Sequence, residues 1–171
     1  MFSPAVAAWV VLLLLLPRCS AQPQMTGPAC SCTVSRVSDG DSFRCSDGRR
    51  VRLIGIDTPE SQQHPFGAQA RAALLKLLPL GSNVRLEIDV AERDRYGRSL
   101  AYVWVGSTLV NEVMVRDGWA ALYTVPPNVK YAERLGAAQR EARARGTGLW
   151  SHRGFECPPS DFRRKRCVNP P

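Results

Sequence analysis

The chain has 171 residues, of which 44% are apolar, 22% charged and 8% aromatic, and 23 Lys and Arg against 15 Asp and Glu give a formal net charge of +8. This composition excludes a disordered polyelectrolyte, the length excludes a large multidomain enzyme, and Gly and Pro show no collagen period. We expect one globular domain. Its positive charge fits either simple solubility or a polyanion partner, which would need the arginines gathered on one face.

The N-terminus has the pattern of a secretory signal peptide, residues 1–21. An unbroken apolar run over residues 5–16 is too short to span a bilayer, and small residues follow it, with cleavage expected after Ala21. A membrane anchor or a lipid attached at Cys19 is the alternative, but Arg18 stands where a lipidation motif has a small residue. We therefore expect a secreted or periplasmic protein without stable membrane association after cleavage.

A mobile leader rich in Pro, Gln and Gly is expected next, over residues 22–31, and regular structure is expected to begin at Cys32. The turn signals Asp39-Gly40-Asp41 and Asp47-Gly48 separate the first three predicted strands. In chain order, the predicted strands cover residues 32–38, 42–46, 50–56, 83–90 and 98–105. The fourth alternates strictly, which puts its apolar residues, Val84, Leu86, Ile88 and Val90, on a core face.

Helical periodicity appears three times. One apolar stripe runs over residues 70–78, and a shorter one runs over residues 110–114. The longest helix is expected to start from an N-cap at Asn128 and to end just before Gly146. Five short, mostly antiparallel strands interrupted by a helix predict an α+β, mainly β fold, a five-stranded OB-fold-type barrel with three helices.

Cysteine usage supports export. Loss of Cys19 with the signal peptide leaves five of the six cysteines, an odd number. The preferred pairs are Cys32 with Cys45, facing each other across a hairpin, and Cys157 with Cys167, closing a short loop. That loop belongs to a basic tail, residues 151–171, which carries Arg163-Arg164-Lys165-Arg166 and is expected to be either a polyanion contact or a solubilising loop. Zinc is excluded for lack of ligands at the required spacing.

Carboxylates and arginines mark the ends of the predicted strands. Asp39-Gly40-Asp41 is not an EF-hand loop, because its sixth position is Arg44 and its twelfth is Arg50. Two further acids, Asp57 and Glu60, follow the third strand. Two arginines lie near the starts of predicted strands, Arg52 in the third strand and Arg98 in the fifth.

With these segments, the chain resembles the staphylococcal-nuclease-like (thermonuclease) family of calcium-dependent nucleases. The resemblance covers about residues 33–150 and predicts a nuclease domain over residues 32–150. It rests on ordered motifs: Ser38-Asp39-Gly40-Asp41-Ser42, Arg52 to Glu60 (RLIGIDTPE), Phe66-Gly67, Asp94 to Tyr102 (DRYGRSLAY), Val110-Asn111-Glu112, Val115-Arg116-Asp117-Gly118 and Gly148-Leu149-Trp150.

The resemblance implies a role for each matching residue. The expected calcium ligands are Asp41 and Asp57 through their carboxylates and Thr58 through its main-chain carbonyl, and an all-oxygen set suits that hard cation. Glu60 matches the residue that orients or deprotonates the attacking water, and Arg52 and Arg98 match the pair that grips the scissile phosphate. The expected substrate-binding residues are Arg95, Tyr96 and Tyr123.

The resemblance also implies the reaction. A calcium-dependent endonuclease of this kind would hydrolyse DNA and RNA with little sequence specificity, prefer single strands, leave 3'-phosphate ends and act as a monomer. The alternative is a non-catalytic OB-fold protein that only binds nucleic acid, and loss of Glu60 or of either arginine would have favoured it. The Ser61 to Pro65 loop is shorter than in the best-known member, and the cysteines and the basic tail lie outside the shared pattern.

Overall fold

The computed structural model describes residues 29–167. The predicted signal peptide lies outside the described residues, as does the predicted leader up to residue 28. Between residues 29 and 167, no helix is long and apolar enough to cross a membrane.

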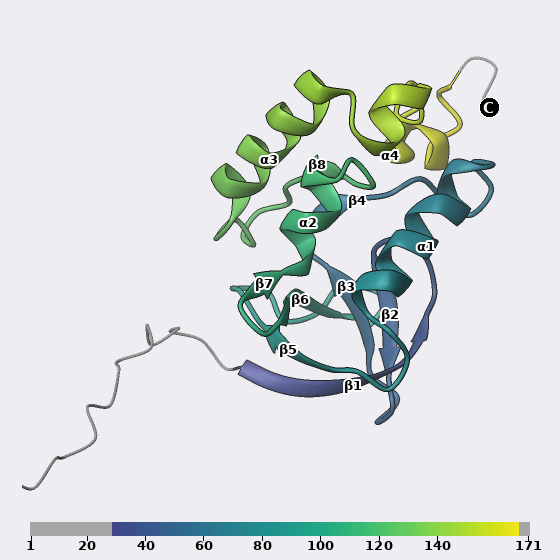
Figure 1. Ribbon diagram of the computed structural model, residues 1–171. Coiled ribbons are helices and arrows are strands. Elements are labelled where there is room, and N and C mark those ends of the chain that lie inside the picture. Colours follow the sequence, from purple (N-terminus) through teal and green to yellow (C-terminus); the bar gives the residue numbers. More distant parts are fainter. Residues whose placement is uncertain (1–28, 168–171) are drawn as a thin grey trace, which may run out of the picture.

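A closed barrel of five strands forms the lower half of the molecule in Figure 1. Its strands are β1 (Ala29–Val37), β2 (Ser42–Cys45), β3 (Arg50–Leu53), β5 (Asn83–Glu87) and β6 (Ser99–Val105). They follow the order β3-β2-β1-β5-β6 with antiparallel pairings, and a parallel pairing of β3 with β6 closes the barrel. The short β7 (Thr108–Leu109) pairs with β6. The predicted OB-fold-type barrel is confirmed.

The first strand begins earlier than predicted. Ala29–Ser31, assigned to the leader from the sequence, belong to β1, because they pair with Arg85–Glu87 of β5. The composition of the preceding residues gave no sign of this pairing, which depends on a strand more than fifty positions away.

The predicted strand over residues 50–56 is broken at Ile54. Its second half is a separate strand, β4 (Gly55–Asp57), which pairs with β8 (Ala121–Tyr123) instead of with the barrel. Gly55 makes this possible: its φ is +79°, and a Cβ there would lie 2.5 Å from Leu135 Cδ1. The break carries Asp57 and the residues after it away from the barrel wall.

The three predicted helices are present as α1 (Phe66–Leu77), α2 (Val110–Arg116) and α3 (Ala132–Arg145). A 3-10 turn, η1 (Gly148–His152), and a short helix, α4 (Pro159–Arg163), follow. In Figure 1, α3 and α4 lie at the end away from β1, and α2 lies between α3 and the barrel.

Asn128 does not cap α3, which starts four residues later. Its side chain instead bonds the backbone of Ala91, accepting from the N–H at 2.7 Å and donating to the carbonyl at 2.9 Å. The same polar side chain thus closes a loop rather than starting a helix.

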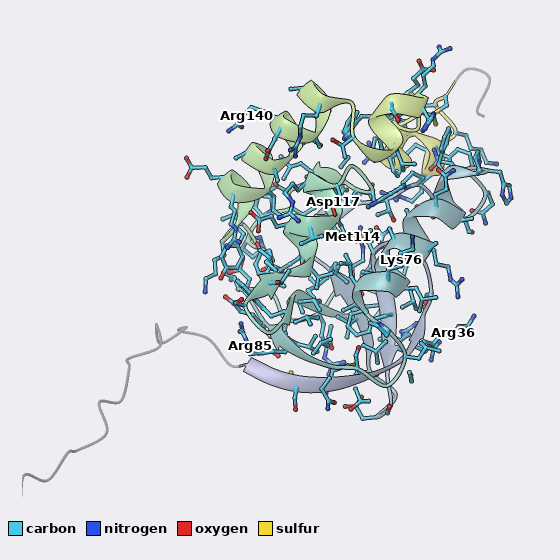
Figure 2. All side chains as sticks on the ribbon, in the orientation of Figure 1. Arg36, Lys76, Arg85, Met114, Asp117 and Arg140 are labelled. Carbon is cyan, nitrogen blue, oxygen red and sulfur yellow. A yellow bond between two sulfur atoms is a disulfide. The ribbon has the colours of Figure 1, made fainter. Side chains whose placement is uncertain are left out.

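The core lies inside the barrel and under α2, where Met114 is fully buried at the centre of Figure 2 while Arg36 and Arg140 point outward. The strict alternation predicted for residues 83–90 is wrong at its end. Val90 is 69% exposed, and Glu87, predicted to face water, is buried. The Glu87 carboxylate accepts hydrogen bonds from Trp104 Nε1 at 2.8 Å and Tyr131 Oη at 3.1 Å, because the segment before α3 covers this part of β5.

Both predicted disulfides are confirmed. Cys32–Cys45 joins β1 to β2, and Cys157–Cys167 closes the tail around α4. Cys30 is exposed and is the free cysteine within residues 29–167.

Candidate active site

A pocket of about 740 Å³ opens where the β1–β2 turn, β4 and the loop before β6 meet. All nine residues predicted to form the site line it: Asp41, Arg52, Asp57, Thr58, Glu60, Arg95, Tyr96, Arg98 and Tyr123. Folding therefore gathers these residues into one pocket from segments that are widely spaced in the chain.

Asp41 is a buried carboxylate held at the start of β2. Its Oδ2 accepts hydrogen bonds from the backbone N–H and the hydroxyl of Thr58, each at 3.1 Å, and its backbone carbonyl accepts from Leu53 N at 2.9 Å. Burial raises the pKa of Asp41 to about 7, against the opposing effect of Arg52. Asp39 and Asp57 add to the rise as neighbouring negative charges.

Arg52 joins the two aspartates. Its Nη1 lies 2.9 Å from Asp41 Oδ2, and its Nη2 lies 3.1 Å from Oδ1 of Asp57, which is buried at the end of β4. The guanidinium also donates to the carbonyls of Leu53 at 2.9 Å and Ile56 at 3.0 Å. It thereby fixes the broken strand as well as the carboxylates, and both of its terminal nitrogens already have partners.

The donors at this end of the pocket are oxygen atoms, which suit a hard divalent cation. Burial raises the pKa of the Asp41 carboxyl despite the nearby Arg52, and a bound divalent cation would favour the ionised form of that carboxyl. Calcium takes six to eight oxygen ligands. Between residues 29 and 167, no group of three or more His, Cys, Asp or Glu is arranged to hold a metal. Two carboxylates and the Thr58 carbonyl would therefore hold the ion together with water and substrate oxygens.

Glu60 stands just beyond β4 on a loop supported by the start of α1. A Cβ on Gly67 would lie 2.1 Å from the Glu60 carbonyl oxygen, so only glycine permits this close packing. The Glu60 N–H donates to Gln63 Oε1 at 2.8 Å. The Glu60 side chain is 32% exposed and lines the pocket.

The loop before β6 supplies cationic and aromatic side chains. Arg98 Nε donates to Asp94 Oδ2 at 2.7 Å, and this is its only side-chain hydrogen bond within residues 29–167, which leaves its terminal N–H groups for a ligand. Burial alone would raise the pKa of Asp94, but hydrogen bonds from Arg98 lower it. The Arg95 guanidinium lies 4.8 Å from the centre of the exposed Tyr96 ring.

A further arginine, Arg163, lines the pocket, and the sequence did not predict it there. Arg163, at the end of α4, holds both oxygens of Asp57, with Nη1 at 3.1 Å from Oδ1 and Nη2 at 2.8 Å from Oδ2. Its Nη1 also lies 2.5 Å from Glu60 Oε1. The hydrogen bonds to Asp57 raise the pKa of Arg163, as does the bond to Glu60. The one signal in the sequence was a basic run between two cysteines, which carries no information on where the run docks.

Comparison with known proteins points to one family. Residues 50–152 match the family model described as staphylococcal nuclease homologue. A thermonuclease of Staphylococcus hyicus is 40% identical over 127 residues, 70% of this chain and 75% of the relative. A thermonuclease of Staphylococcus intermedius is 41% identical over 125 residues, which are 68% of this chain and 74% of the relative. Endonuclease YncB of Bacillus subtilis is 33% identical over 133 residues, which are 72% of this chain and 63% of the relative.

Proposed function

The chain belongs to the staphylococcal nuclease family, and on that basis we propose that it is an exported, calcium-dependent nuclease that hydrolyses phosphodiester bonds of DNA and RNA with little sequence specificity. The observation that carries the proposal is the gathering of acidic and basic side chains in one pocket: Asp41, Asp57, Glu60, Arg52 and Arg98. The relatives named as thermonucleases and as an endonuclease support it.

Calcium would be held by Asp41, Asp57 and the Thr58 carbonyl. When bound, it would offset the negative charge of the phosphate oxygens, which otherwise repels a nucleophile. Arg98, oriented by Asp94, and Arg52 would donate hydrogen bonds to the same oxygens, where charge builds up in the transition state. Both terminal nitrogens of Arg52 already have partners, whereas those of Arg98 have none within residues 29–167, so Arg98 has more N–H groups to donate to the phosphate.

Glu60 is the general base in this proposal. It takes a proton from a water molecule as the water oxygen bonds to phosphorus. The bond from phosphorus to the 5'-oxygen breaks, and that oxygen takes up a proton from solvent water as it leaves. The products are a 3'-phosphate and a 5'-hydroxyl.

Substrate recognition would rest on the backbone and on stacking. Arg95 would contact a phosphate, and the exposed rings of Tyr96 and Tyr123 would take unstacked bases, which favours single strands and ignores sequence. A monomer suffices for this chemistry, because one chain supplies every residue named.

Export follows from the proposed signal peptide and fits the two disulfides, which persist in oxidising compartments. The mature chain is expected to begin at Gln22, so mass spectrometry of the protein recovered outside the cytoplasm should give that N-terminus. An intact N-terminus, or a lipid on Cys19, would contradict cleavage after Ala21.

The role of Glu60 is tested by Glu60→Gln, which removes the base and keeps the shape. We expect the rate of cleavage of single-stranded DNA to fall about 10²- to 10⁴-fold. Glu133→Gln, an exposed position on α3, is the matched control and should cleave like the wild type. Equal cleavage by Glu60→Gln and Glu133→Gln would contradict the proposed base. Salt-sensitive binding without cleavage by the wild type would instead favour the non-catalytic alternative.

A further inference from the structure

The tail loop, residues 157–167, contacts the side chain of Glu60. The carboxylate of Glu60 has one hydrogen-bonding side-chain partner within residues 29–167, and that partner is Arg163 of the tail loop. The same guanidinium binds both oxygens of Asp57, so it bridges the two carboxylates.

A second connection reaches the backbone of Glu60. The fully buried side chain of Gln63 accepts from the Glu60 N–H at 2.8 Å and donates to the Cys157 carbonyl at 3.0 Å. The tail loop therefore holds Glu60 twice, through its carboxylate by Arg163 and through its backbone by way of Gln63.

The disulfide joins the two anchor points. Cys157, whose carbonyl holds Gln63, is bonded to Cys167, and the loop that this bond closes carries Arg163. The family match ends at residue 152, so the whole loop lies beyond it. The arrangement therefore lies outside the residues that the family model matches.

Resting on the proposed nuclease function, we propose that Arg163 is a positioning residue of the active site: the disulfide-closed tail loop clamps Glu60 relative to Asp57. The site is complete only once Cys157 and Cys167 are oxidised. Reduction frees the tail loop and leaves Glu60 without its side-chain partner.

The physical reason is the flexibility of a partly exposed glutamate. Its several side-chain torsions leave an unsupported carboxylate spread over many rotamers. A general base must lie within hydrogen-bond reach of the attacking water, and a displacement of about 1 Å can cost on the order of 10² in rate. A guanidinium presents several donors in a rigid fork, which lets it hold two carboxylates at a fixed separation where a lysine ammonium would not.

The test compares variants of the mature chain in calcium with single-stranded DNA. Arg163→Gln should lower kcat about 10- to 100-fold with KM changed less than about threefold, because the base and not the substrate is displaced. Arg163→Lys should recover only part of kcat. The double variant Cys157→Ser/Cys167→Ser, which leaves the Cys32–Cys45 disulfide in place, should behave like Arg163→Gln. Arg164→Gln, which removes the same charge from an exposed neighbour, is the control and should keep the wild-type kcat.

Hydrogen exchange gives a second readout that needs no activity. In Arg163→Gln and in the disulfide variant, backbone amides of residues 60–63 should exchange faster, while those of the barrel strands stay protected, which also shows that the variants are folded. Unchanged kcat and exchange in Arg163→Gln would overturn the proposal, and so would a higher kcat, since the contact would then be inhibitory. A wild type that does not cleave at all contradicts the nuclease itself, whereas normal cleavage with an unaffected Arg163→Gln contradicts only the clamp.

Discussion

As a proposed calcium ligand, Asp41 must be ionised, but its ionisation destabilises the calcium-free fold. Its carboxylate is buried beside Asp39 and Asp57, and burial raises its pKa from 3.8 to about 7. A group whose pKa is raised on folding binds its proton more tightly in the folded state. Stability therefore falls as the pH rises from about 4 to about 7, and ionised Asp41 destabilises the calcium-free protein above that range.

Asp41→Asn should stabilise the calcium-free protein at pH 8. We expect a gain of about 2 kcal/mol in the free energy of unfolding, shrinking toward pH 4, where Asp41 is protonated in the fold. Urea denaturation at pH 8 and at pH 4, with a chelator present, measures the free energy of unfolding of the variant and of the wild type.

Asp47→Asn is the control, since hydrogen bonds from Arg49 lower the pKa of this exposed carboxyl. Its effect should be small and in the opposite direction. Equal stability of Asp41→Asn and the wild type at pH 8 would show that ionised Asp41 does not destabilise the calcium-free fold.

Residues next to strand ends were predictable because polar side chains there break the local pattern. Arg52 is out of phase with its apolar neighbours, and Asp57 and Glu60 follow directly after them. Arg163 was not predictable as a pocket residue. Its place depends on how a tail docks against a loop about a hundred positions earlier, and no local pattern records that contact.

Among the elements, α2 fixes the break between β3 and β4. Asn111 on α2 is fully buried, donates to the Ile54 carbonyl at 2.8 Å and accepts from Val103 N at 2.9 Å. Both bonds go to backbone groups that the strand break would otherwise leave buried without partners. The position of Asp57 thus depends on a helix that does not line the pocket.

Asn111→Ala should destabilise the fold by about 2 to 4 kcal/mol, because it leaves buried backbone groups unpaired. The urea midpoint should fall accordingly. Asn83→Ala, at an exposed asparagine that bonds Thr33 Oγ1, is the control and should change stability by less than about 0.5 kcal/mol. Similar losses in the two variants would contradict the role given to Asn111.

Element types were more predictable than element ends. Alternation and turn residues predicted the barrel strands, and apolar stripes predicted the three helices, because these patterns are local. The split at Ile54 and the burial of Glu87 come from tertiary partners, Leu135 beside Gly55 and Tyr131 over β5. Such tertiary contacts override the strand pattern and cannot be predicted from it.

At the scale of the whole molecule, the barrel is a scaffold that brings distant segments to one pocket. The net charge of +8 belongs to the chain as a whole, whereas the pocket itself holds paired acids and arginines. We place the proposed chemistry in that pocket, and the disulfide-closed tail loop contacts it through Arg163.

In the function proposed here, this pocket hydrolyses phosphodiester bonds with calcium. The most direct measurement is cleavage of a labelled single-stranded DNA by the purified mature chain while calcium is added, chelated and added again, with the end groups of the products determined. We predict cleavage at millimolar calcium, arrest by excess chelator, recovery with fresh calcium, and 3'-phosphate ends. Cleavage that continues in the chelator, or no cleavage with calcium present, would contradict a calcium-dependent nuclease.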